Sequence, residues 1–197
     1  LDGLPELSCA TVDFEEGAYE STKFFIERGH KRIAMLKAFG GFQPGVERRR
    51  GYLRALEEAS IEPDESLIRT VSFDFTDLTR CVHRLLLDRS VTALIDCSAT
   101  EDGASLRNGA RRAGRTAGSD LEVLTWSYRE DEAVLPEACA QMWLPQFDAT
   151  GEGLDELAAW FHGERQDPIH VIYRPTLLGK VPENEITQPR RLFNSRT

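Results

Sequence analysis

The sequence predicts an α/β protein in which a parallel β-sheet carries helices on both of its faces. The main observation is an alternation of short apolar runs with amphipathic helical segments, sustained over about 120 residues. RIAMLK (32–37) and VTALID (91–96) are typical of the apolar runs. Strands that alternate with helices pair in parallel through right-handed crossovers, because each helix packs back onto the sheet between two strands.

Elements in the first half of the chain are bounded by loop segments and by a helix-stopping glycine. The segment 15–28 has apolar residues at helical spacing and is followed by Gly29, a C-terminal stop. AFGGFQPG (38–45) leads into a second helix, and IEPDES (61–66) separates that helix from the next strand. The expected order is a strand at 9–12, a helix at 15–28, a strand at 32–37, a helix at 46–60 and a strand at 67–72.

The alternation continues to residue 126 and then becomes less regular. An acidic loop (128–137) and a short apolar piece, CAQMWL (139–144), follow the run LEVLTW (121–126). The tail from 181, rich in Pro, Asn and Arg, offers little apolar surface and is expected to be extended or mobile. The remaining expected elements are helices at 75–87, 100–113 (ended by Gly114) and 150–162, and strands at 91–96, 121–126 and 170–173.

Composition places the chain among ordinary globular proteins and argues against direct nucleic-acid binding. Of its 197 residues, 41% are hydrophobic and 29% are charged, which is enough apolar material for a sizeable core. The formal net charge is −9, whereas affinity for DNA or RNA rests largely on a basic surface that displaces counterions. Any contact with DNA must therefore come from a part outside this sequence.

The cysteines and the N-terminus suggest a soluble cytoplasmic location. Cys9, Cys81, Cys97 and Cys139 are far apart and form no C-x-x-C, so we expect free thiols in a reducing compartment rather than a zinc site or redox pair. The start LDGLPELS lacks the basic and apolar regions of a signal peptide, and no apolar run reaches the roughly 20 residues of a membrane span. We expect no membrane contact.

Arg48 is the member of the triplet Arg48–Arg50 that fold geometry singles out. Ligands of open parallel sheets bind in the crevice beyond the carboxyl ends of the strands. Arg48 lies in the first turn of its expected helix, on the buried stripe that continues through Tyr52, while Arg49 and Arg50 rotate outward. A side chain at this place faces the crevice. The alternative is a structural ion pair with Glu47 or a nearby carboxylate, and the residues alone leave both readings open.

Sequence motifs give no support to catalysis. AFGGFQPG matches neither G-x-G-x-x-G nor a Walker loop, and Ser98 lacks the G-x-S-x-G elbow of a hydrolase. The four histidines have no Cys, Asp or Glu at metal-ligand spacing. We therefore expect no enzyme, no metal and no cofactor. Trp126, at the end of an expected strand, is the tryptophan best placed to stack on a sugar ring.

Two stretches of the chain resemble a known family. VDFEEGAYESTKFFIERGHKRIAML and ERRRGYLRALEEASIEPDESLI are similar to the effector-binding domain of LacI/GalR bacterial transcriptional regulators. Those proteins read V-x-x-D-N-x-x-G-A-Y-x-A-T-x-x-L-I-x-x-G-H-x-x-I-A and then R-x-x-G-F-x-x-A-L-x-x-A-G-I. Weaker similarity continues through VTALIDCSATEDGASL, SDLEVLTW and WLPQFDATGEGLDELAAWFHGE. The clearest matches are Asp13, Gly17, Ala18, Tyr19, Thr22, Gly29, His30, Arg32, Ile33, Ala34, Arg48, Gly51, Tyr52, Ala55, Leu56, Ala59 and Ile61.

The resemblance implies a periplasmic-binding-protein-like fold, in which two α/β lobes close on a small molecule, usually a sugar or related metabolite. It also implies a homodimer that binds DNA through an upstream helix-turn-helix outside this chain. Residues 1–180 would be a domain fragment, with 13–141 as the C-terminal lobe, 143–165 as a segment returning to the first lobe, and 181–197 as a tail. The implied function is effector sensing and dimerisation in a LacI-type repressor, with the effector controlling operator affinity. The alternative is a solute-binding protein of a sugar transporter.

By position, the resemblance assigns effector contacts to Asp13, Arg48 and Phe73, with Arg48 as the clamp for an anion or hydroxyl. Ser127, next to Trp126, takes the place of a pocket aspartate of the family. A second family aspartate falls on Ala99. Because both carboxylates are replaced, the resemblance implies a less polar or an acidic ligand, or a pocket that has lost its effector.

Overall fold

The computed structural model describes residues 8–38, 41–71, 75–100, 102–164, 166–179 and 191–193. Its main body is a six-stranded sheet in the order β3-β2-β4-β5-β6-β8. Neighbours from β3 to β6 pair in parallel, and β8 pairs antiparallel with β6 at one edge. The strands are β2 (Ile33–Lys37), β3 (Ile68–Thr70), β4 (Ala93–Cys97), β5 (Glu122–Ser127), β6 (Ala140–Trp143) and β8 (Thr176–Leu178).

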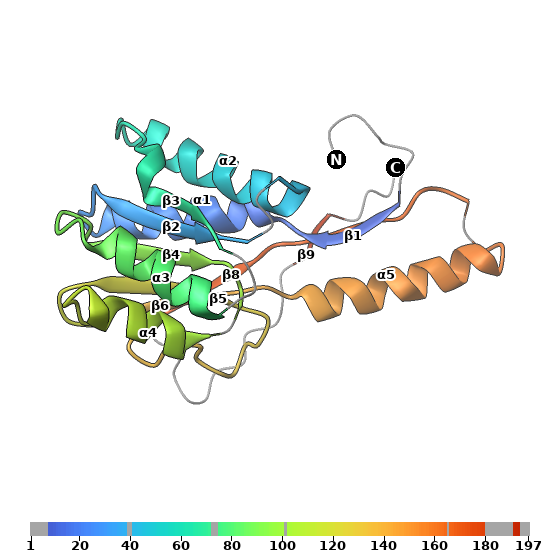
Figure 1. Ribbon diagram of the computed structural model, residues 1–197. Coiled ribbons are helices and arrows are strands. Elements are labelled where there is room, and N and C mark those ends of the chain that lie inside the picture. The colour runs from blue at the N-terminus through green and yellow to red at the C-terminus, as the bar shows by residue number, and fades with distance from the viewer. Residues whose placement is uncertain are drawn as a thin grey trace.

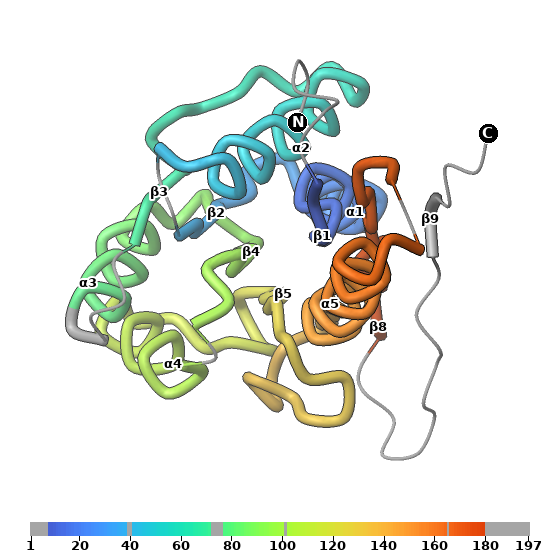
Figure 2. Tube along the Cα trace, turned by 90° about the vertical axis from the view of Figure 1, so that its right-hand side faces the viewer, coloured from blue at the N-terminus to red at the C-terminus, as the bar shows by residue number. Residues whose placement is uncertain are grey.

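Helices cover both faces of this sheet, which confirms the predicted fold class. Alternate residues of a strand point to opposite faces, so Ile33 and Met35 join one core cluster and Ala34 and Leu36 join the other. The first cluster lies under α1 (Phe14–Glu27) and α2 (Gln43–Glu58). The second lies under α3 (Phe75–Leu86) and α4 (Gly103–Arg112). Figure 2 shows the two helix pairs on opposite sides of the strands.

A second, smaller sheet and a long helix form an arm beside the main body. β1 (Cys9–Val12) pairs in parallel with β7 (His170–Tyr173), which pairs antiparallel with β9 (Arg191–Phe193). The helix α5 (Gln146–Phe161) packs on β1 and β7 and projects away from the main sheet (Figure 1). β1 therefore lies outside the main parallel sheet. Its partner β7 lies about 160 residues further along the chain.

Several boundaries differ from those expected for local reasons. α2 begins at Gln43 instead of 46, because Pro44 fits a first helical turn, where no backbone N–H is required. α4 begins at Gly103 instead of 100, because Asp102 caps it through a bond from the Ser105 amide. α5 begins four residues before the expected 150, and a 3₁₀ turn (Glu65–Leu67) precedes β3. Apart from β9, the tail 181–197 lies outside the described residues.

All four cysteines are unpaired in this structure, and Cys97 is buried in the sheet. Burial raises the pKa of the Cys97 thiol far above its usual range. Over the residues that are described, no helix combines the length and apolar composition that crossing a bilayer requires.

A charged cluster at the amino edge of the sheet fastens the end of α1 to β5. The Arg28 guanidinium donates two hydrogen bonds to the Glu122 carboxylate, from Nε and Nη2 at 2.7 Å each. His30 Nε2 lies 3.2 Å from the same carboxylate. These contacts, the Arg28 hydrogen bonds above all, lower the pKa of Glu122 to about 2.

Replacing Arg28 by alanine is expected to reduce the free energy of unfolding at pH 7 by about 1 kcal/mol. The lowered pKa of Glu122 taken alone corresponds to a larger loss of unfolding free energy. However, the side chains of Arg28 and Glu122 are 45% and 31% exposed, so solvent screens the pair. A carboxylate with a lowered pKa stabilises the fold above its unfolded pKa, near 4.5, and loses this contribution as the pH falls towards 2. Urea unfolding at pH 7 and at pH 2.5 measures the difference, which should shrink at the lower pH.

The control for this substitution is Arg112→Ala, because Arg112 is exposed and forms no ion pair within the described part of the chain. Its effect should be small at both pH values. An Arg28→Ala loss of the same size at both pH values would show that the Glu122 contact is not its source.

Candidate functional site

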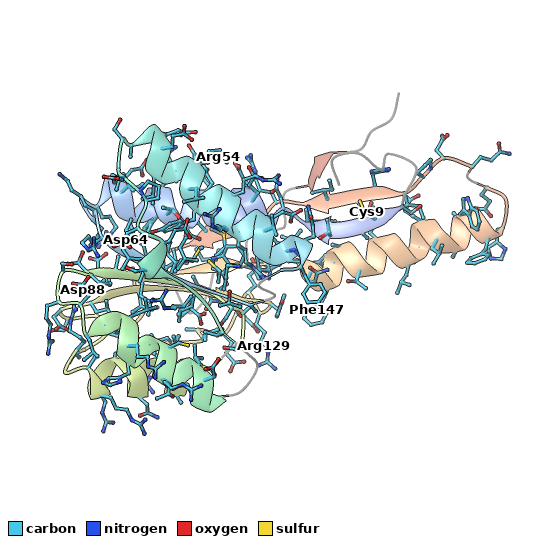
Figure 3. The ribbon with its side chains drawn as sticks, turned by 45° about the horizontal axis from the view of Figure 1, so that its top comes forward. Cys9, Arg54, Asp64, Asp88, Arg129 and Phe147 are labelled. Atoms are coloured by element: carbon cyan, nitrogen blue, oxygen red, sulfur yellow. The ribbon has the colours of Figure 1, made fainter. Side chains whose placement is uncertain are left out.

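Polar and aromatic side chains gather where the central strands of the main sheet end. β2, β4 and β5 are parallel neighbours, so their carboxyl ends at Lys37, Cys97 and Ser127 lie along one edge. Figure 3 shows Arg129 and Phe147 at this side of the molecule, and Asp64 and Asp88 at the opposite, amino edge. Open parallel sheets bind ligands at the carboxyl edge, where Lys37, Cys97 and Ser127 lie.

Arg48 lies at this edge and is completely buried. Its guanidinium carbon lies over the Phe14 ring, 4.6 Å from the centroid, and over the Trp126 ring, 5.3 Å from the centroid. A desolvated cation over aromatic faces gains about 2 kcal/mol from their quadrupoles. Burial lowers the pKa of Arg48, although nearby Cys97, Tyr128 and Asp96 oppose this shift. The sequence-based expectation that Arg48 turns inward is correct, and its contact with a ligand stays a prediction.

Trp126 belongs to the core, and the Arg48 guanidinium packs on its ring. Its side chain is fully buried, its ring is stacked against Phe14, and its Nε1 donates to Ser21 Oγ at 3.0 Å. The alternation of β5 turns this residue towards α1 and away from solvent. The indole therefore offers no exposed face in this structure, and the contact of Trp126 with a sugar ring stays a prediction.

Asp13 is the N-cap of α1, at the crossing from the arm to the main body. Its Oδ1 accepts a hydrogen bond from the Glu16 amide at 2.9 Å. Its own amide donates to the Tyr173 carbonyl at 2.9 Å, which ties the start of α1 to β7. The capping role is sufficient to explain an aspartate here, and ligand contact stays a prediction.

Ser127 ends β5 and borders a small cavity of about 120 Å³, which Arg129, Glu132, Ala133 and Val134 also line. Its hydroxyl accepts a hydrogen bond from the Arg129 amide at 2.9 Å. The loop that follows β5 is held by the buried side-chain amide of Gln141, whose Nε2 donates to the carbonyls of Arg129 and Glu132, each at 3.1 Å. Phe73, the remaining predicted site residue, lies outside the described residues.

Asp96 is a residue at this edge that sequence reasoning did not select. It is only 1% exposed, and its Oδ1 accepts hydrogen bonds from the amide and the hydroxyl of Ser98. Desolvation raises the pKa of its carboxyl group. The available signal was a charged residue inside the apolar run VTALID. The Ser98 hydroxyl, which lacks the sequence motif of a hydrolase nucleophile, donates a hydrogen bond to Asp96.

The described residues hold no group of three or more His, Cys, Asp or Glu side chains arranged to bind a metal ion. Among the described residues, this edge offers a buried guanidinium, two buried aromatic rings and carboxylate and hydroxyl oxygens. Such a set can recognise the polar groups of a small molecule by hydrogen bonding.

No protein-family model matches the chain. Among curated proteins, the transcriptional regulator CelR of Thermobifida fusca is 36% identical over 126 residues, which are 62% of this chain and 36% of CelR. A solved CelR–cellobiose complex superposes with a TM-score of 0.77 at 28% identity, covering 90% of this chain and 55% of that one. A LacI-type regulator from Bacillus cereus gives a TM-score of 0.81 at 18% identity, covering 94% and 66%, and supports the fold alone.

These neighbours agree with the predicted periplasmic-binding-protein-like fold class. The chain spans about half or less of the length of CelR and of three further curated relatives, of which two are regulators of the helix-turn-helix type and one is a catabolite control protein. In sequence and in fold, the chain is therefore similar to LacI-type transcriptional regulators over part of their length.

Proposed function

We propose that this chain is the effector-sensing and dimerising part of a LacI-type transcriptional repressor. The observation that carries the proposal is Arg48, a buried cation in contact with two aromatic rings at the carboxyl edge of the sheet. The family resemblance assigns this same position to the clamp for the effector. A polar group that costs so much to bury is typical of a site that needs it for recognition.

A small sugar is the effector class that the relatives favour. Of the two solved structures reported above, CelR has the higher sequence identity, and its structure is a complex with cellobiose, a neutral disaccharide. Effector binding would then shift the regulator between two states that differ in affinity for DNA. DNA contact would come through a helix-turn-helix outside this chain, since a net charge of −9 does not suit a DNA-binding surface.

The further parts of the proposal follow the family. The regulator would be a cytoplasmic homodimer without enzymatic activity, metal or cofactor, and without membrane contact. The alternative, a solute-binding protein of a sugar transporter, shares the fold, but the curated relatives reported above are transcriptional regulators. The sequence of the complete gene product distinguishes the two, because a helix-turn-helix supports the regulator and a secretory signal supports the transporter.

Thermal unfolding of the full-length protein in the presence of candidate effectors tests the proposal. The panel contains neutral sugars including cellobiose, sugar acids and nucleobases. A ligand at about 100 times its Kd stabilises the folded state by about 2.7 kcal/mol, which raises Tm by about 5 to 10 °C for a domain of this size. We expect one class to give a saturable shift of this order. The absence of a shift with every class at millimolar concentration would contradict effector sensing.

A further inference from the structure

Helices α3 and α4 pack so closely that their exposed faces form one surface. Gly109 lies where they meet, and a Cβ atom there would lie 2.6 Å from Val82 Cβ and 2.8 Å from the Thr79 carbonyl oxygen. Each helix leads from the carboxyl end of one parallel strand to the amino end of the next, so both helices end side by side at the amino edge of the sheet. Figure 2 shows this pair of helices on the side of the molecule away from α5.

The ends of these two helices carry exposed arginines. Arg84 of α3 and Arg111 and Arg112 of α4 form no ion pair within the part of the chain that the structure describes. Arg89 follows α3, and its Nη1 donates to the Gly114 carbonyl at 3.1 Å, which holds it across to the turn that ends α4. Four guanidinium groups therefore come together where the two helices end.

The acidic side chains that follow α3 and α4 are already engaged by other arginines. Asp88 lies 2.9 Å from Arg32, and Asp120 lies 2.9 Å from Arg115. A cation near a helix C-terminus offsets the helix dipole, but the effect is confined to the last turn, and Arg89 lies beyond it. The surface thus has an excess of positive charge in a chain whose formal net charge is −9.

A large apolar side chain accompanies these arginines. Leu87 lies three residues after Arg84 and two before Arg89, and it is 60% exposed, whereas Leu85 and Leu86 are buried. A phosphate backbone would use the arginines but not the leucine, and a long polyanion would also meet the negative charge of the rest of the chain. Arginine is enriched in protein–protein interfaces. The partner chemistry that fits is therefore a protein segment with acidic residues beside an apolar side chain.

We infer that an acidic segment of a partner protein binds the surface formed by Arg84, Leu87, Arg89, Arg111 and Arg112. The guanidinium groups donate to carboxylates of the partner, and an apolar side chain of the partner covers Leu87. Stable complexes bury about 800 Å² on each partner, more than five side chains provide, so binding is weak and falls with ionic strength. The inference is independent of the proposed function, because none of these residues belongs to the candidate site.

Fluorescence anisotropy with the full-length protein at low ionic strength tests the inference. The probes are a labelled synthetic peptide of glutamates interrupted by leucines and a DNA duplex of unrelated sequence. We expect the wild type to bind the peptide, and Arg84→Gln combined with Arg111→Gln to weaken this binding by about 10-fold. Leu87→Ser should weaken it about 3-fold through the lost apolar contact. Binding of the duplex should be the same in these variants as in the wild type.

The matched control is Arg49→Gln combined with Arg50→Gln, which removes the same charge from two exposed arginines of α2 and should leave peptide binding unchanged. Thermal unfolding of each variant confirms that it is folded. Failure of the wild type to bind the peptide would overturn the inference, as would equal peptide binding by the wild type and the Arg84→Gln, Arg111→Gln variant. Weaker binding of the duplex by that variant would also overturn it, because the surface would then serve nucleic acid. None of these results bears on effector sensing, which the thermal screen tests separately.

Discussion

Replacing Gly51 by alanine is expected to lower the free energy of unfolding by about 3 kcal/mol, at the upper end of the usual cost of overpacking. Gly51 lies in α2 where this helix crosses α1. A Cβ atom there would lie 2.0 Å from the Glu15 carbonyl oxygen and 2.8 Å from the Tyr19 amide nitrogen. Both obstacles are backbone atoms of a helix, so no side-chain rotation relieves the clash and the two helices must move apart. Equilibrium unfolding in guanidinium chloride measures the loss.

Gly151→Ala is the matched control for this substitution. Gly151 also lies within a helix, α5, but nothing approaches within 4 Å of the position a Cβ would take. Alanine should therefore stabilise the protein by about 0.5 to 1 kcal/mol through its better helix propensity. If Gly51→Ala unfolded with the stability of the wild type, α1 and α2 could not be in backbone contact at Gly51.

The parallel sheet and its four covering helices could be predicted because their signals are local. Each apolar run and each amphipathic segment between 14 and 127 carries its own periodicity, and alternation of the two implies the sheet. The membership of β1 could not be predicted in this way. Its four residues pair with β7, and nothing within CATV or its neighbours specifies a partner so far along the chain.

The candidate site could be predicted only in part, for a similar reason. Helical spacing was enough to turn Arg48 inward and Arg49 outward. The contacts of Arg48 with the Phe14 and Trp126 rings depend on how α1, α2 and β5 pack against one another, which no local pattern specifies. The buried environment of Asp96 likewise depends on elements that pack around it in three dimensions, and no local residue pattern encodes that.

The second large effect is expected for Arg48→Met, which should weaken effector binding by about 100-fold while leaving the fold intact. Methionine is apolar and matches the arginine side chain as far as Nε, so it keeps the aliphatic packing and removes the buried charge beside the Phe14 and Trp126 rings. We expect its unfolding free energy to lie within about 1 kcal/mol of the wild type. Arg48→Ala should lose binding as well, but it leaves a cavity and costs about 2 to 4 kcal/mol of stability.

This pair of variants separates recognition from packing at Arg48. Calorimetric titration with the sugar that the thermal screen identifies measures the affinity, and Tm without ligand measures the packing. Arg49→Met is the control, because Arg49 is exposed and is paired with Glu65, so the same change one residue further along should leave sugar binding unchanged. Sugar affinity retained in Arg48→Met would mean that the guanidinium is not a ligand contact. Arg48 would then be a structural cation that stabilises the packing at the Phe14 and Trp126 rings.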